Sequence, residues 1–439
     1  QRIIAEGVKL ILTCDTGIAE HEAIAAAQTA GVEVIITDHH DLPDSLPPAL
    51  AAINPKQAGC DYPFKELAGV GLAYKLAQAL LDHLPHNGLQ AGDYLDLVAL
   101  GTIADLAPLY GENRKLAQAG LQRLNRALRP GLTALMNKVG SKSVISAGTI
   151  GFVIGPRLNA AGRLDSALAA YNLLMASTEF EAIHLAEQLD LQNRERQKRT
   201  LQTVEAARQT ILADNIGSPL YFIHHPDFSQ GVVGLAASRL AEEFYRPILV
   251  AERGPDITKG SARSIPEFHI TEALDQCADL LVRYGGHAAA AGFTLKNEHV
   301  PAFQERLLEV ARRNLQVPRL KPVITVDAEI NLRGVNSKLV EDINALQPFG
   351  YGNPTPCFLT RNLTIKSVKA IGQDGHHLRL VLHDGKQVWQ AIGFRQGYRA
   401  GSLRLGQLVD AVYTLEFNEW NGERQLQLEL RDLRPTEGG

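Results

Sequence analysis

Two short apolar runs with an alanine-rich helical pattern between them open the chain. The runs cover residues 8–13 and 32–37, and the helical pattern covers about 19–30. Continuous β-branched runs joined by a helix predict neighbouring parallel strands of a sheet that is buried on both faces. Ligands bind such sheets beyond the carboxyl ends of the strands. The polar residues that follow each run are therefore the first candidates for chemistry.

Helical patterns dominate the next part of the chain. They cover residues 69–84 and 93–108, and a Gly-rich segment at 148–162 separates them from a long helix over about 178–213. The middle of this helix, residues 192–199, is polar almost all round. That pattern is typical of a solvated helix that bridges two domains.

A second α/β pattern and then an all-β pattern follow. The α/β pattern covers about residues 219–315, and Pro318 and Pro322 mark a linker after it. Alternating strands with Gly-containing turns then predict a small closed barrel, with the OB-fold as the leading candidate. These strands are expected at residues 323–330, 363–371, 377–383, 387–394, 408–417 and 425–433.

The expected fold class is α/β with an added barrel. At roughly 100–200 residues per domain, a chain of 439 residues holds two to four domains. The expected parts are a parallel-sheet domain over 1–180, a connecting helix over 181–214, a second α/β domain over 215–318 and a C-terminal β-barrel over 322–439.

Composition and charge narrow the class of protein. With 45% hydrophobic and 21% charged residues, the chain has the balance of a globular protein. We recognise no apolar run of the roughly 18–20 residues that a membrane span needs and no signal peptide. The four cysteines form no CxxC pair, which favours the reducing cytoplasm over a disulfide framework or a zinc ribbon. A net charge of −4 indicates no bulk basic surface, and the acidic excess lies in residues 1–180, where it suits cation binding.

Acidic and imidazole side chains follow both strands of the first pattern. Asp38, His39 and His40 come directly after the second run, and Asp15 follows the first run 23 positions earlier. Carboxylates and imidazoles together suit Mn²⁺ or Mg²⁺ better than the thiolate-rich sites of structural zinc. The alternative is that Asp38 caps the next helix and the histidines are ordinary loop residues. Asp105 ends a third apolar segment and is a candidate for the same crevice.

Two other segments suit the binding of phosphate groups. Arg157, Asn159 and Arg163 lie in the Gly-rich segment, where arginines can hold phosphate oxygens in a bidentate manner. The alternative is that these arginines pair with carboxylates inside a domain interface. Further on, the sequence reads Gly285-Gly286-His287, and we expect this glycine pair to lead into a helix whose amino end binds an anion. Ser261 and Arg263 precede it in the same predicted domain.

Taken together, these motifs resemble the DHH phosphoesterase superfamily, and within it the family of exonucleases specific for single-stranded DNA. The resemblance implies a metal-dependent enzyme that uses two divalent cations, Mn²⁺ or Mg²⁺, to remove nucleotides from the 5′ end of single-stranded DNA in repair and recombination. It also implies a DHHA1-like second domain and an OB-fold that follows the strand. The stretches that carry it are residues 13–17, 37–40, 99–105, 157–164, 261–263, 285–287 and 348–356.

The resemblance assigns roles residue by residue. Metal ligands would be Asp15, Asp38, His39 and Asp105, with Asp38 and His40 acting at the scissile phosphate. The residues that it assigns to binding nucleic acid or phosphate are Arg157, Asn159, Arg163, Ser261, Arg263, Gly285, Gly286 and His287.

One motif of that family has no counterpart here. The family carries a further aspartate motif on a strand before the first run, whereas the only acid among residues 1–7 is Glu6, and residue 1 is Gln rather than Met. We therefore expect an amino-terminally truncated copy that holds at most one metal ion and is nearly inactive. Expected partners are single-stranded DNA, a single-strand-binding protein and a helicase, with no membrane and a monomeric state. Two alternatives stay open: a phosphatase or oligoribonuclease acting on short nucleotides, and a non-catalytic single-strand-binding module.

Overall fold

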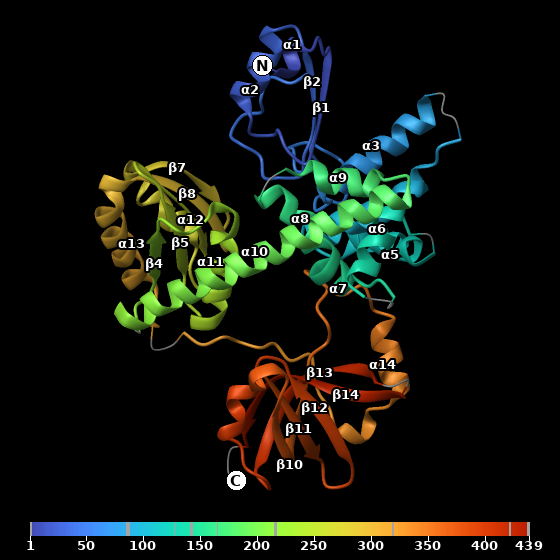
Figure 1. Cartoon of the computed structure of the whole chain (residues 1–439), viewed down its shortest axis with the longest axis vertical. Coiled ribbons are helices and arrows are strands. Elements are labelled where there is room, and N and C mark those ends of the chain that lie inside the picture. Colours follow the sequence, from blue (N-terminus) through green and yellow to red (C-terminus); the bar gives the residue numbers. More distant parts are fainter. Residues whose placement is uncertain are drawn as a thin grey trace. The chain divides into compact units, whose positions relative to one another are not determined.

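The chain forms two compact units in the computed structural model (Figure 1). Unit 1 comprises Gln1–Ala127, Val144–Gly151 and Ile324–Gly439, and unit 2 comprises Leu128–Ser143 and Phe152–Val323. None of the described helices combines the length and the apolar character that a bilayer crossing requires. The structure describes residues 2–84, 88–126, 128–140, 144–164, 166–214, 217–317, 320–420 and 423–436.

A three-stranded parallel sheet begins unit 1, as the first two apolar runs predict. Its order is β1 (Leu10–Cys14), β2 (Glu33–Thr37) and β3 (Ala51–Ile53), and α2 (His21–Thr29) connects the first two strands. The expectation that both faces are buried is wrong for β1. Leu10 and Leu12 are 48% and 47% exposed, so the face of β1 that carries them is open to solvent.

The other elements described for unit 1 up to residue 151 are helices, and they confirm the helical patterns of the sequence. Helix α4 is buried almost all round, and it packs against α3 and α5. The elements are α1 (Arg2–Ala5), α3 (Gly69–His83), η1 (Ala91–Tyr94), α4 (Leu95–Ala104), α5 (Gly111–Arg126) and α7 (Ala147–Thr149).

The Gly-rich segment at 148–162 is not a separator but is helical throughout, through α7, η2 (Ile150–Ile154) and α8 (Gly155–Leu164). Its small residues let α8 pack closely on α10 (Glu179–Asp214), and Ala160 and Ala161 are fully buried. The long helix is therefore confirmed as α10, and the polar stretch at 192–199 is at least partly exposed apart from Asn193, so the helix is solvated along one side and packed along the other. Asp190 and Asn193, near its middle, are each only 1% exposed. Two further helices of unit 2 are α6 (Pro130–Lys138) and α9 (Leu168–Met175).

A five-stranded mixed sheet forms the second α/β part, in the order β4-β5-β6-β8-β7. The expected helix after Gly285-Gly286 is wrong, because these residues end β7 and the chain turns back as strand β8. Residues 291, 293 and 295 are buried in alternation, which is a strand period of two. The elements are β4 (Tyr221–His225), α11 (Gln230–Phe244), β5 (Ile248–Arg253), β6 (Ile257–Arg263), α12 (Ile270–Asp275), η3 (Ala278–Leu280), β7 (Leu281–Gly286), β8 (Ala290–Lys296), η4 (Asn297–His299) and α13 (Val300–Asn314).

The predicted small barrel is confirmed. Strands β10, β11, β12, β14 and β13 pair in turn, and β10 closes the circle by pairing with both β11 and β13. The expected strand over 323–330 shrinks to β9 (Ala328–Glu329), because Val323 is 84% exposed and the segment before β9 makes no sheet pairing. The other elements are η6 (Leu332–Gly334), α14 (Ser337–Asn344), β10 (Phe358–Ile371), η7 (Gln373–Gly375), β11 (His377–His383), β12 (Val388–Gly393), η8 (Gly397–Gly401), β13 (Leu408–Trp420) and β14 (Glu423–Pro435).

Candidate metal centre

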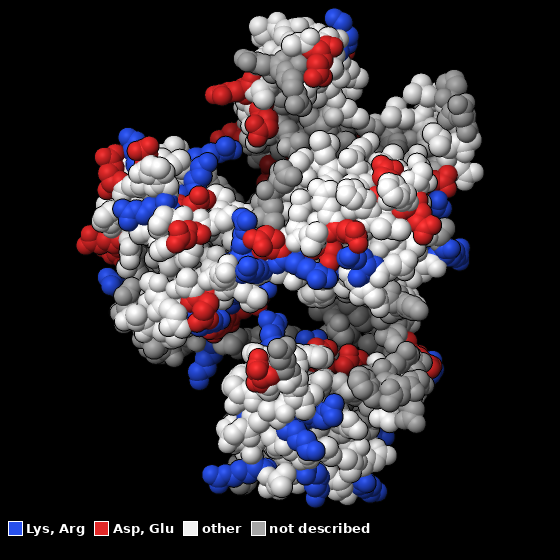
Figure 2. Space-filling view, in the orientation of Figure 1, with Lys and Arg blue, Asp and Glu red and all other residues white. Residues whose placement is uncertain are grey.

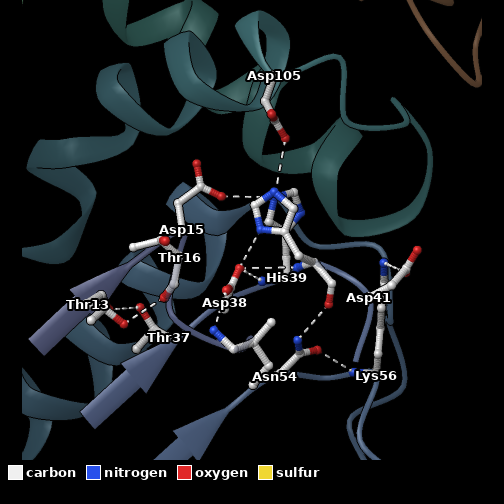
Figure 3. A network of polar contacts seen from close by, with 12 residues as sticks. Thr13, Asp15, Thr16, Thr37, Asp38, His39, Asp41, Asn54, Lys56 and Asp105 are labelled. Carbon is white, nitrogen blue, oxygen red and sulfur yellow. Dashed lines mark hydrogen bonds and ion pairs between the residues drawn. The ribbon is translucent and has the colours of Figure 1, made fainter. Parts of the chain in front are cut away.

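The candidate site lies where the three parallel strands of unit 1 end. The Asp15 N–H donates to the Thr37 carbonyl (2.9 Å), and the Asp38 N–H donates to the Ile53 carbonyl (3.1 Å). Asp15 has a φ of 64°, a left-handed conformation that is rare for a residue with a side chain and is often found at functional sites. The backbone at these strand ends therefore presents Asp15 and Asp38 at one edge of the sheet (Figure 3).

Asp38 is almost completely buried, and hydrogen bonds occupy both of its carboxylate oxygens (Figure 3). Oδ2 accepts from the Ile18 N–H (3.0 Å), and Oδ1 accepts from the N–H groups of His39 (2.8 Å) and His40 (3.2 Å). Oδ1 also lies 2.7 Å from His40 Nδ1. Burial alone would raise the pKa of Asp38, but the bonds from Ile18 and His40 outweigh it and lower that pKa. Asp38 thus fixes the loop and the His40 ring.

His39 directs its ring between two carboxylates (Figure 3). Its Nε2 lies 2.9 Å from Asp15 Oδ1 and 3.6 Å from Asp105 Oδ2. That nitrogen is buried, yet its contact with Asp15 does not have the geometry of a hydrogen bond. The Asp15 carboxylate raises the pKa of His39 above its usual range, burial acts the other way, and the charges of Asp105 and Asp38 add to the increase. The lone pairs of these groups converge as metal ligands do.

Asp105 reaches the site from the carboxyl end of α4. The next residue, Leu106, has a φ of 59° and is 70% exposed, so the chain turns sharply away from the helix. Burial raises the pKa of the Asp105 carboxyl, and Asp15 raises it further against the effect of His39. A carboxyl and an imidazole with raised pKa values beside a second carboxylate form a cluster that a positive charge would stabilise.

The donor set fits a divalent cation. Ligand atoms of Asp15, His39 and His40 lie within 4.8 Å of one another, and Asp105 approaches the same nitrogen of His39 as Asp15 does. Carboxylate oxygens with imidazole nitrogens are ligands that suit Mn²⁺, and carboxylates alone suit Mg²⁺.

Two supporting residues were missed by the sequence analysis. Gly69, the first residue of α3, has no room for a side chain, because a Cβ there would lie 2.3 Å from Asp15 Oδ1. Asn54 follows the third strand, and its Nδ2 donates to the His40 carbonyl (2.9 Å). The rule that polar residues gather at strand ends would have found Asn54, whereas only the folded structure brings Gly69 to Asp15.

The arginine segment of α8 lies in unit 2. Arg157 Nε donates to Asp190 Oδ1 (2.9 Å) and its Nη1 donates to the Val153 carbonyl (2.8 Å). This arrangement matches the alternative in which the arginine pairs with a carboxylate. Asn159 is exposed. The side chain of Arg163 lies outside the described residues.

The second phosphate-binding candidate gathers at one end of the five-stranded sheet. Ser261 is opposite Gly292 on β8, and Gly292 is opposite Gly285 on β7, so the three lie in one row across the sheet. Arg263 Nη1 donates to Ser261 Oγ (2.7 Å). Gly286 is the last residue of β7, and the exposed His287 follows it. The fold of unit 2 therefore brings these predicted residues together.

Three protein-family models match the chain. The DHH family, N-terminal domain, matches residues 1–102, the DHHA1 domain matches 214–313, and the RecJ OB domain matches 326–432. These regions contain the candidate metal-binding residues other than Asp105, the five-stranded sheet and the barrel.

Curated relatives align with almost the whole chain. The single-stranded-DNA-specific exonuclease RecJ of Bacillus subtilis (strain 168) is 40% identical over 98% of this chain and 54% of its own length. The protein of the same name from Haemophilus influenzae is 36% identical over 99% of this chain and 79% of its own length. The chain thus spans about half the length of the Bacillus relative.

Solved structures share the fold. RecJ from Thermus thermophilus in complex with Mn²⁺ is 32% identical and superposes with a TM-score of 0.86, over all of this chain and 64% of the other. The complex of RecJ with Mg²⁺ from the same organism has 30% identity and a TM-score of 0.80, and 69% of it is covered.

Proposed function

We propose, because this chain belongs to the RecJ family, that it hydrolyses single-stranded DNA from the 5′ end and releases 5′-mononucleotides in a reaction that needs Mn²⁺ or Mg²⁺. The observation that carries the proposal is the buried His39 Nε2, which lies between the carboxylates of Asp15 and Asp105 and makes no hydrogen bond. A catalyst of phosphodiester hydrolysis must neutralise developing negative charge, and this cluster can hold the cation that does so.

Asp15, His39 and Asp105 are the residues that we expect to hold the cation. Bound there, a divalent cation supplies a water of lowered pKa and a positive charge beside the phosphate. Asp38 was also expected to be a ligand, but its oxygens already accept four hydrogen bonds, so we assign it to orienting the loop.

His40 is placed to exchange a proton with the substrate. Its Nδ1 is tied to Asp38 Oδ1, which leaves Nε2 as the ring atom that is available, and its side chain is 54% exposed. A carboxylate that holds one ring nitrogen fixes the orientation and the tautomer of the imidazole. We infer that His40, when its ring carries a proton on both nitrogens, donates the Nε2 proton to the leaving oxygen, or a hydrogen bond from that N–H to the phosphate.

We further infer that the 439-residue chain turns over slowly. In the part of the chain that the structure describes, potential ligand atoms gather in one group of this kind, at Asp15, His39 and His40. Mechanisms with two cations need bridging ligands for both. One tightly held cation supports cleavage, but less effectively than a pair.

Single-stranded DNA is the substrate that the remaining surfaces suit. Ser261, Arg263 and His287 share one end of a sheet and offer donors to phosphate oxygens. Figure 2 shows Lys and Arg side chains along α10, interspersed with acids, so that unit 2 offers local rather than bulk positive charge. Local cations can hold the backbone of a strand without regard to sequence.

The test is a nuclease assay with stoichiometric chain, 5′-phosphorylated single-stranded DNA and Mn²⁺. We expect mononucleotides to appear, and EDTA or His39→Ala to stop their release. The control is His83→Ala, which removes an exposed histidine at the end of α3. Activity on dinucleotides alone would instead favour a phosphatase or oligoribonuclease. Binding of DNA that needs neither metal nor His39, with no cleavage, would favour a non-catalytic module.

A further inference from the structure

A turn of the barrel segment, residues 348–353, lies directly on the loop that follows Asp105. The Leu109 N–H donates to the Tyr351 carbonyl (2.6 Å). Gly350 and Asn353 exchange N–H to carbonyl hydrogen bonds across the turn (2.9 and 3.1 Å), so the turn is a closed unit of its own. Both segments belong to unit 1.

The surfaces of the turn and the loop fit so closely that side chains are excluded. A Cβ on Gly350 would lie 2.8 Å from Leu109 Cδ1. Gly352 has a φ of +75°, and a Cβ there would lie 2.9 Å from Pro108 Cβ and 3.1 Å from Tyr110 Cδ1. Real Cβ atoms essentially never come within 3.0 Å of such atoms, so a side chain at Gly352 would force the turn or Pro108 to shift, whereas at Gly350 the end of the Leu109 side chain would have to move.

Helix α5 makes a second connection to the same region. Arg114 Nη2 donates to the Leu346 carbonyl (2.8 Å), and Gln118 Nε2 donates to the Gln347 carbonyl (2.8 Å). The Asn353 side chain donates to the Leu346 and Pro348 carbonyls from the other side (3.1 and 2.8 Å). The turn is therefore fixed before it meets the loop.

The loop between Asp105 and Leu109 is short and strained. Its Leu106 has a left-handed φ of 59°, a conformation that persists in a non-glycine residue only when the surroundings enforce it. The Ala107 N–H donates to the Thr102 carbonyl (3.2 Å), and Leu109 is 2% exposed under the turn. Helix α4 holds one end of this loop and the turn holds the other, with Asp105 between them.

We propose that the 348–353 turn positions Asp105, so that the barrel sets the affinity of the metal centre. The inference rests on the proposed function, because it takes Asp105 as a ligand. Without the turn, the loop relaxes and the half-exposed Asp105 carboxylate leaves its place 3.6 Å from His39 Nε2. The barrel then contributes to catalysis directly, and not only by holding DNA.

The test compares Gly352→Ala with Gly406→Ala by Mn²⁺ titration of the full chain, using electron paramagnetic resonance to count free Mn²⁺. Gly406 is a matched control, since it has a φ of +80° in the barrel and nothing within 4 Å of a Cβ. We expect Gly352→Ala to weaken Mn²⁺ binding about tenfold, as loss of ligand support does, and Gly406→Ala to leave it unchanged. Gln118→Ala, which adds no strain, should weaken it in the same direction.

A kinetic readout separates positioning from DNA binding. Higher Mn²⁺ should restore the rate of Gly352→Ala, with the KM for DNA unchanged. Wild-type affinity in Gly352→Ala, an equal loss in both glycine variants, or a change in KM alone would overturn the inference. Failure of the proposed function itself would be distinguishable, because then neither the wild-type chain nor His39→Ala would bind Mn²⁺ at this centre.

Discussion

Replacing Gly69 by alanine tests the candidate metal centre without replacing any of the proposed ligands. The new Cβ would lie 2.3 Å from Asp15 Oδ1, 2.6 Å from Cγ and 2.7 Å from Cβ. Ordinary contacts between carbon atoms are about 3.5–4.0 Å, so the Asp15 carboxylate must move by about 1 Å or more. Its side chain is 50% exposed and can turn towards solvent, away from His39, but this rotation leaves the Asp15 Cβ in place, so the backbone must shift as well.

Metal binding should fall, and stability should fall moderately. A misplacement of about 1 Å in a catalytic site can cost about a hundredfold, and we expect Mn²⁺ affinity to fall between tenfold and a hundredfold. Gly69 begins α3, but the gain of about 0.4–1 kcal/mol that alanine gives in place of a helical glycine requires a position without a clash. Overpacking costs about 1–3 kcal/mol, so the free energy of unfolding should fall by about that much.

The assay is Mn²⁺ titration beside urea unfolding of the same preparations. Gly92→Ala is the control, because Gly92 lies in helix η1 with nothing within 4 Å of a Cβ. Unchanged Mn²⁺ affinity in Gly69→Ala would refute the reasoning, since Asp15 would then not be needed where the structure places it. A loss of stability well beyond about 3 kcal/mol would show general misfolding instead.

Three further predictions follow from the described contacts. Because the pKa of His39 is raised, this histidine keeps its proton to a higher pH than an ordinary histidine does, and a cation must compete with that proton. Mn²⁺ affinity should therefore begin to fall at a pH above 6.5 as the solution is acidified. An affinity that stays constant between pH 5.5 and 8.5 would contradict this. Arg157→Ala leaves the buried Asp190 with fewer partners, so the free energy of unfolding in urea should fall by about 2 kcal/mol, with little change in the KM for DNA. A raised KM with unchanged stability would instead show that Arg157 binds phosphate. The thiol of Cys277 is fully buried, which raises its pKa to about 11, so a disulfide reagent should label the exposed Cys14 first and reach Cys277 only after unfolding.

Patterns with a clear period predicted most of the fold. Apolar runs identified β1 and β2, and alternation identified the barrel strands from 363 onward. Strand ends meet at one edge of a parallel sheet, so the sequence alone was enough to place Asp15 and Asp38 together. The prediction of a helix within residues 285–292 was wrong, because the small residues there fit a helix and a strand equally well. Pairing of β8 with β6 makes this part of the chain a strand.

The finer parts of the site depend on contacts between distant residues. Nothing in the local sequence shows that Arg157 meets Asp190 thirty-three positions later, or that Gly69 lies against Asp15. The four hydrogen bonds that engage Asp38 likewise depend on the loop geometry, and they are the reason why we propose an orienting role for this residue. Residue types thus indicated metal chemistry, and packing decided which side chains are available for it.

The most direct test of the central claim is the identity of the first product. The chain, in excess over DNA and with Mn²⁺, is mixed with one single-stranded oligonucleotide that carries label at its 5′ phosphate and another labelled at its 3′ end. We predict that the 5′ label leaves at once as a mononucleotide, while the 3′ label stays in progressively shorter strands, and that His39→Ala abolishes both changes. Release of the 3′ label first, internal fragments, or cleavage that persists in His39→Ala would contradict the account.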